Sequence, residues 1–110
     1  MIGVKEVIVL LEAAQDLEAG REFYEKASVG VGQYFVDCII SDLDSLKVQA
    51  GIHRKESGLY RMLSKRFPFS IYYDTQNGFA RVAAILDMRR DPAWIRNELE
   101  DRNSSPVGTR

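Results

Sequence analysis

The chain has 110 residues, of which 45% are hydrophobic and 28% charged, and it contains a single cysteine, Cys38. This length and composition predict one globular domain and exclude a largely disordered chain. One cysteine excludes an internal disulfide and a cysteine-based zinc site, and it favours a reducing cytoplasm. The apolar run from Val7 to Leu11 is too short for a membrane span or a signal segment.

The net charge of −1 hides a segregation of sign along the chain. Residues 1–52 carry four basic and nine acidic side chains, a net charge of −5, whereas residues 53–96 carry nine basic and four acidic ones, a net charge of +5. The second half is therefore the half that could meet a polyanion.

The first half predicts a strand followed by two helices. Residues 4–11 are rich in β-branched and apolar side chains, which is typical of a strand. Apolar residues then recur at helical spacing from Ala13 to Ala27 and again from Val31 to Leu46, with Gly51 expected just past the end. The glycines of the segment 28–32 allow a tight reversal, so we expect a helical hairpin.

The second half predicts three strands, at residues 59–67, 69–73 and 79–88, and a final helix. Asn77-Gly78 favours a tight hairpin because both residues tolerate positive φ. Alternation assigns Tyr73 to the core and Tyr72 to the opposite face. On the last strand it groups Val82, Ala84 and Leu86 on one face and Arg81, Ala83, Ile85 and Asp87 on the other. Asp91-Pro92 is a helix start, and that helix should run to about Arg102.

The predicted order is β-α-α-β-β-β-α, class α+β: an N-terminal strand and a helical hairpin packed on a small, mostly antiparallel sheet. Periodicity alone does not place the first strand. We expect one domain over residues 1–102 and a flexible tail over residues 103–110. We expect the hairpin to cover one face of the sheet and the arginine-bearing face to look at a partner.

Two segments carry a resemblance to a known family. Residues 60–73 contain Arg61-Met62-Leu63-Ser64-Lys65-Arg66-Phe67-Pro68-Phe69, and residues 84–92 end in Arg89-Arg90-Asp91-Pro92. Together they resemble the RelE/ParE superfamily of toxins, whose members show an Arg-x-Leu-x-x-Arg-Phe-Pro-aromatic strand pair and a closing strand that ends in arginines before Asp-Pro. Upstream, Asp16-Leu17, Phe23-Tyr24, Gly30-Val31-Gly32 and Phe35 resemble the family's helical hairpin.

The resemblance implies the toxin of a type II toxin–antitoxin system, with a RelE/ParE-like fold and a role in growth inhibition or plasmid stabilization. It implies a cytoplasmic protein neutralised by a cognate antitoxin, and it allows a toxin–antitoxin hetero-oligomer. The target is either DNA gyrase, bound in the manner of ParE, or the ribosome and its mRNA, cut in the manner of RelE endonucleases. No cofactor, metal or membrane is implied.

The candidate site residues are mostly arginines, because guanidinium groups bind phosphate oxygens in pairs. The catalytic candidates are Arg61, Arg81, Asp87 and Arg89, and the candidates for target binding are Lys65, Arg66, Tyr72 and Arg90. Any single arginine can equally keep the exposed face of a sheet soluble. Asp87 stands where many relatives carry His; it could act as a base, but pairing with Arg89 or Arg81 is the favoured interpretation. His53, the only histidine, is expected to be a solvated loop residue.

Overall fold

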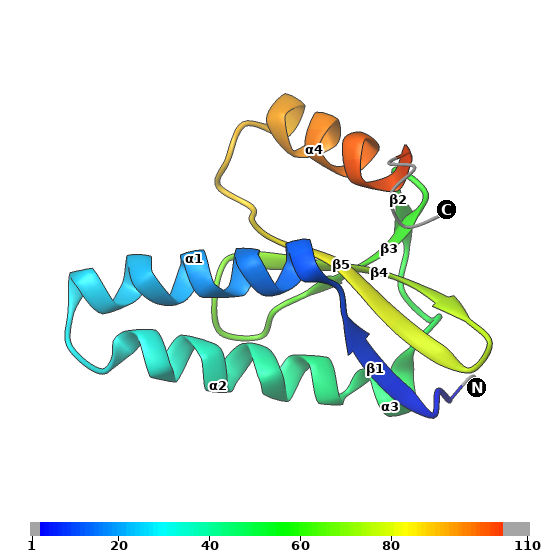
Figure 1. The fold of residues 1–110 in the computed structure, drawn as a ribbon, viewed down its shortest axis with the longest axis horizontal. Helices are drawn as coiled ribbons and strands as arrows, with labels where there is room; N and C mark the ends of the chain where they lie inside the picture. Colours follow the sequence, from blue (N-terminus) through cyan, green and yellow to red (C-terminus); the bar gives the residue numbers. More distant parts are fainter. Residues whose placement is uncertain (1–2, 105–110) are drawn as a thin grey trace.

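The computed structural model describes residues 3–104 and places a five-stranded sheet between a helical hairpin and a C-terminal helix (Figure 1). The elements in chain order are β1 (Glu6–Val9), α1 (Leu11–Ala27), α2 (Val31–Asp44), α3 (Leu46–Gln49), β2 (Lys55–Glu56), β3 (Leu59–Leu63), β4 (Phe69–Gln76), β5 (Phe79–Asp87) and α4 (Pro92–Ser104). The sheet order is β1-β5-β4-β3-β2, and β1 pairs with β5 in parallel while the other described pairs are antiparallel. The predicted α+β class is confirmed.

Two features hold the helices of the hairpin together: a carboxylate that binds the loop, and a glycine that allows close packing near the middle of α1. Glu25 accepts hydrogen bonds from the backbone N–H groups of Gly30 and Gly32, which fixes the reversal between α1 and α2. A Cβ on Gly20 would lie 2.6 Å from the ring of Phe35, so a glycine here allows the two helices to approach. The core against the sheet then contains Ala13, Phe35 and Ile39, all fully buried.

The turn between β4 and β5 has the geometry that the sequence predicts. Asn77 and Gly78 have φ values of 54° and 84°, which is the left-handed region that a two-residue hairpin requires. This turn fixes the register of the two longest strands, in which Gln76 pairs with Phe79.

A β-bulge in β5 overturns the predicted division of that strand into two faces. Tyr72 pairs with Ala84 and Tyr73 with Val82, so Ala83 is an extra residue without a partner on β4. An extra residue reverses the alternation on either side of it. Val82 therefore faces the helical hairpin together with Ile85, whereas Ala84 and Leu86 face the opposite side.

Helix α4 covers that opposite side, so the prediction of an open arginine-bearing face was wrong. Ile95 and Leu99 of α4 pack on Tyr72, Ala84 and Leu86 in a second core cluster. Figure 1 shows α4 on the side of the sheet away from the hairpin. The helix reaches Ser104, two residues past the predicted end, and the rest of the expected tail, residues 105–110, lies outside the described residues.

Strand β3 is shorter than the sequence indicated. It ends at Leu63 rather than Phe67, because Ser64 turns the chain by donating its backbone N–H to the carbonyl of Phe69 at 2.9 Å. Lys65 thus lies in the loop between β3 and β4 and does not share a strand face with Arg61.

Candidate functional site

Four basic side chains gather at one end of the sheet, and we call them the sheet-end cluster: Lys65, Arg66, Arg89 and Arg90. Lys65 and Arg66 belong to the loop between β3 and β4, whereas Arg89 and Arg90 follow β5. The two segments are joined where Met88 donates its backbone N–H to the carbonyl of Pro68 at 2.8 Å. All four side chains are exposed, so an anionic partner can reach them.

Asp87 holds Arg89 in place. The carboxylate of Asp87 accepts hydrogen bonds from Nε of Arg89 at 2.9 Å, from its Nη2 at 2.7 Å and from its backbone N–H at 2.8 Å. These bonds lower the pKa of Asp87 and raise that of Arg89, so both groups stay charged. Nη2 of Arg89 also lies 3.4 Å from the hydroxyl of Tyr24 on α1. A carboxylate bound in this way positions an arginine, and it is a poor proton acceptor.

Arg90 is held by an aromatic ring. Its guanidinium carbon lies 3.6 Å from the ring centroid of Trp94, in the first turn of α4. Such stacking leaves the edges of the guanidinium free to donate hydrogen bonds to an anion. Two of the three arginines of the cluster, Arg89 and Arg90, are therefore pre-oriented.

Arg61 and Arg81 lie elsewhere, each beside a carboxylate. Arg81 forms a forked ion pair with Asp74 of β4, with Nε–Oδ1 and Nη2–Oδ2 distances of 2.9 and 2.7 Å. Nε of Arg61 lies 3.7 Å from Oε1 of Glu56. Arg81 precedes Asp87 by six residues of β5, or roughly 20 Å at the rise of a strand. The four catalytic candidates therefore do not converge on one point.

The remaining candidate, Tyr72, lies in the core beneath α4 with 2% of its surface exposed. A side chain buried in this way cannot contact a target, so Tyr72 is not part of the target-binding surface. Its neighbour Tyr73 is fully buried on the hairpin side, in agreement with its predicted place in the core.

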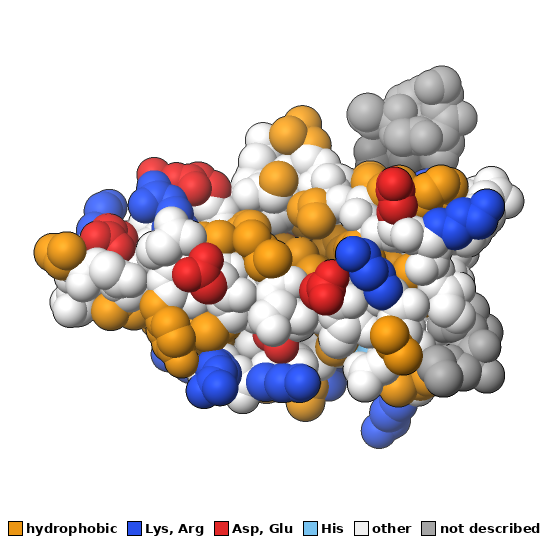
Figure 2. Space-filling view, turned by 90° about the horizontal axis from the view of Figure 1, so that it is seen from below, with side chains coloured by type: hydrophobic (Ala, Val, Ile, Leu, Met, Phe, Trp, Pro, Cys, Tyr) orange, Lys and Arg blue, Asp and Glu red, His pale blue; other side chains and the backbone are white. Residues whose placement is uncertain are grey.

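Figure 2 shows one face of the molecule from below, and on this face acidic and basic side chains lie close to one another around a central hydrophobic area. The charge segregation along the sequence is therefore not reproduced as a uniform basic surface on this face. The basic side chains of the second half are instead concentrated in small areas such as the sheet-end cluster.

A pocket of about 670 Å³ lies along the β3 edge of the sheet, between β3 and the C-terminal part of the helical hairpin, and Lys65 of the sheet-end cluster is among the residues that line it. His53 lines it, and Nδ1 of its ring hydrogen-bonds the hydroxyl of Tyr73. That hydroxyl also accepts the backbone N–H of Gly51 at 3.0 Å. Burial lowers the pKa of His53 and raises that of Tyr73. The expectation of a solvated loop histidine was therefore wrong, because its partner is 20 residues away and no local pattern indicates it.

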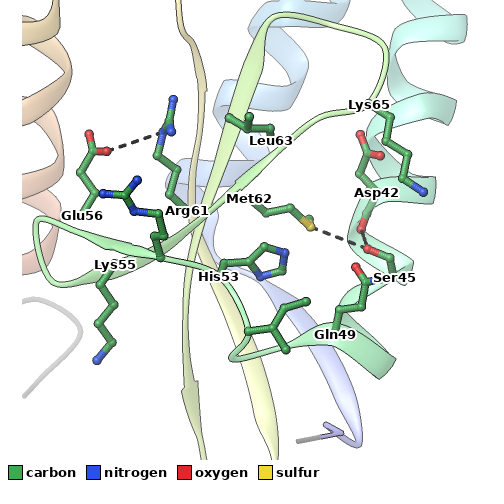
Figure 3. A pocket seen from close by; sticks show the side chains of 12 residues that line it. Asp42, Ser45, Gln49, His53, Lys55, Glu56, Arg61, Met62, Leu63 and Lys65 are labelled. Atoms are coloured by element: carbon green, nitrogen blue, oxygen red, sulfur yellow. Dashed lines mark hydrogen bonds and ion pairs between the residues drawn. The ribbon is translucent and has the colours of Figure 1, made fainter. Parts of the chain in front are cut away.

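The helical wall of this pocket is polar. Asp42, 5% exposed, accepts a hydrogen bond from the hydroxyl of Ser64 at 2.7 Å. Ser45 donates its hydroxyl to the carbonyl of Asp42 at 2.6 Å and lies 3.7 Å from the sulfur of Met62. Figure 3 shows Met62 and His53 directed into the space between β3 and this wall.

The described residues offer neither a metal site nor a helix that could span a membrane. Residues 3–104 contain no group of three or more His, Cys, Asp or Glu side chains that could hold a metal ion. Within the same range no helix is both long enough and apolar enough to span a bilayer.

Comparison with known proteins identifies the fold. Neither a protein-family model nor a curated protein matches the sequence. Among solved structures, the model is similar to a chain of the chromosomal ParDE toxin–antitoxin system of P. aeruginosa, with a TM-score of 0.69 and 18% sequence identity, over 81% of this chain and 98% of that one. This likeness shows a ParE/RelE-like fold.

Proposed function

We propose that the chain is the toxin of a type II toxin–antitoxin module, which inhibits growth by binding an essential target such as DNA gyrase and is neutralised by a cognate antitoxin. The observation that carries the proposal is the likeness to a chain of a ParDE system over nearly the whole of that chain. The sheet-end cluster supplies the surface, because Arg89 and Arg90 are pre-oriented and exposed.

The site geometry favours binding over RNA cleavage. Cleavage requires a proton acceptor within hydrogen-bond reach of the attacking group. The carboxylate of Asp87 already accepts three hydrogen bonds from Arg89. Asp74, the carboxylate beside Arg81, is likewise held in an ion pair, and this pair lies far from Asp87 along β5. A surface of oriented arginines without a free base fits a protein that inhibits by occupying its target.

The alternative is a RelE-like, ribosome-dependent mRNA endonuclease. One observation favours it: His53, whose lowered pKa leaves it neutral near pH 7, lines the same pocket as Arg61. A neutral imidazole can accept a proton, and an arginine can stabilise a phosphate that gains charge.

Two assays separate these functions. Supercoiling by purified gyrase is measured with increasing amounts of the protein, and mRNA breaks are mapped in cells after its induction. Our proposal requires loss of supercoiling with intact transcripts. Breaks at ribosome-occupied codons together with normal supercoiling would establish the endonuclease instead.

A further inference from the structure

Strand β1 forms one edge of the sheet, and its outer side is unpaired (Figure 1). It pairs in parallel with β5, and no other strand among residues 3–104 pairs with it. Leu10 donates its backbone N–H to the carbonyl of Val82 on β5 at 2.9 Å. The backbone groups of a strand point to alternate sides from one residue to the next, so Ile8 also faces β5. Val7 and Val9 therefore direct their N–H and C=O groups outward.

The side chains along this edge are apolar and exposed. Ile8 and Val9 are each 37% exposed, and Leu11 at the start of α1 is 73% exposed. Ile40 of α2 is 52% exposed and lines the same groove as Val9. From Ile8 to Leu11 the chain has no charged residue and no proline, which are the residues that prevent pairing at an edge strand. Such an edge is typical of a surface that another chain covers.

The opposite edge of the sheet is protected. It is formed by β2, which consists of two residues only, Lys55 and Glu56. Both are exposed and charged, and short charged edge strands resist pairing with another chain. The two edges therefore differ, and β1 is the one suited to pairing.

The charges beside β1 indicate which chain could cover it. The groove between β1 and α2 is lined by two cations, Lys5 and Lys47, and by two carboxylates, Glu6 and Asp44. Nζ of Lys47 lies 3.2 Å from Oδ1 of Asp44, so these two charges already compensate each other. A strongly acidic or strongly basic partner gains no net attraction here. A second copy brings the same balanced set, so it meets no excess of like charge.

The sequence of the edge is also complementary to itself. Val7-Ile8-Val9 reads the same in both directions. If two copies meet antiparallel about a two-fold axis at Ile8, Val7 lies opposite Val9 of the second copy, and the outward groups of both residues can exchange N–H···O=C bonds. Ile8 then lies opposite Ile8 of the second copy at a position without such bonds, where the side chains of antiparallel strands are closest.

We propose that two copies of the chain pair through their β1 edges, antiparallel about a two-fold axis at Ile8, so that their five-stranded sheets form one continuous sheet. The inference does not depend on the proposed function. Because the paired strand is short, the interface is small, and we expect dissociation on the order of micromolar concentration. The sheet-end cluster stays accessible, since β1 pairs with β5 only as far as Val82 whereas the arginines of the cluster follow Asp87. A dimer therefore presents the cluster twice.

The first test places a cysteine at the proposed axis. Ile8→Cys is combined with Cys38→Ser, so that the new thiol is the only one in the chain. Opposite residues at such a position have Cα atoms about 4.5 Å apart, which is within the range that a disulfide spans. Oxidised glutathione, which is reduced as the two thiols are oxidised, should therefore convert the protein to a covalent dimer.

Leu63→Cys in the same Cys38→Ser background is the matched control. Leu63 is also an exposed apolar residue of a strand, but it lies on β3, away from the proposed axis. This variant should stay monomeric under the same oxidation. Equal linking of the two variants, or no linking through position 8, would overturn the proposal.

The second test follows reversible association of the unmodified chain by sedimentation and by hydrogen exchange. With rising protein concentration a dimer should form, and exchange should slow at the amides of Val7 and Val9. Ile8→Lys places two like charges opposite each other at the axis and should raise the dissociation constant at least about tenfold. Leu63→Lys makes the same change on β3 and should leave it unchanged.

The melting temperature shows whether Ile8→Lys is folded, and if it is not, the cysteine variants and the exchange of the unmodified chain decide. A chain that stays monomeric at all concentrations would overturn the proposal, as would a dimer without slowed exchange at Val7 and Val9. Slowed exchange at these amides only after addition of a different protein would assign the edge to that partner and would equally overturn it.

Discussion

Asp16 and Arg102, 86 residues apart, form a forked ion pair in which Nη1–Oδ2 and Nη2–Oδ1 distances are 2.6 and 2.9 Å. Their side chains are 15% and 8% exposed, and Asp16 also accepts the backbone N–H of Ile85 at 3.0 Å. One carboxylate therefore joins α1, β5 and α4. It fixes the helix that covers the second face of the sheet.

Arg102→Ala should destabilise the fold strongly, because it leaves the carboxylate of Asp16 buried without its cation. Removing one partner of a buried ion pair costs about 3 kcal/mol or more. Urea unfolding measures the loss, and hydrogen exchange should show α4 opening first. Arg96→Ala, on the exposed side of the same helix, serves as the control and should change stability by less than about 0.5 kcal/mol. Equal effects of the two variants would contradict the role given to the pair.

Gly20→Ala tests the packing of the helical hairpin. Alanine favours a helix over glycine by about 1 kcal/mol, but its Cβ would lie 2.6 Å from the buried ring of Phe35. Overpacking of this kind costs about 1–3 kcal/mol, so we expect a net loss of stability. In thermal unfolding, Phe35→Leu should cost less in the Gly20→Ala background than alone, since it makes room for the methyl group. Additive effects would argue against a direct clash.

His53 should make stability fall in mildly acidic solution. Burial lowers its pKa in the folded state below the value of about 6.5 that the unfolded chain has. The unfolded state then binds the proton more readily than the folded state. The contribution of neutral His53 to stability is therefore complete above pH 6.5, and the free energy of unfolding decreases as the pH falls below that value. Urea unfolding at pH 7.5 and 5.5 measures this. His53→Gln should flatten the difference between the two pH values, and an unchanged difference would refute the assignment.

Charge reversal in the sheet-end cluster should weaken toxicity without unfolding the domain. Arg89→Glu with Arg90→Glu places two new carboxylates beside Asp87 and Asp91 on an exposed surface, where the cost in stability is modest. Growth after induction measures toxicity, and the melting temperature measures the fold. A fall in melting temperature as large as that of the core truncation Leu86→Ala would contradict a role in target binding.

The elements were predictable from the sequence, whereas the arrangement of their faces was not. Local patterns indicated the hairpin between α1 and α2, the Asn77-Gly78 turn and the start of α4 at Asp91-Pro92. The bulge at Ala83 was not predictable by strict alternation, because an extra residue leaves no mark in composition. That one residue moves Val82 and Ile85 onto the same face.

The site was predictable only in part, for a related reason. The arginines of the sheet-end cluster are adjacent in sequence or in neighbouring loops, so a motif could identify them. The bonds of Asp16 to Arg102 and of His53 to Tyr73 join distant segments, and only the fold brings them together.

The most direct test of the toxin assignment is growth after induction of the free protein, with and without the product of the neighbouring open reading frame. We expect growth arrest by the chain alone and recovery when a short acidic neighbour is expressed with it. Normal growth would contradict the toxin assignment if the cells contain as much soluble, folded protein as is sufficient for growth arrest by a known toxin.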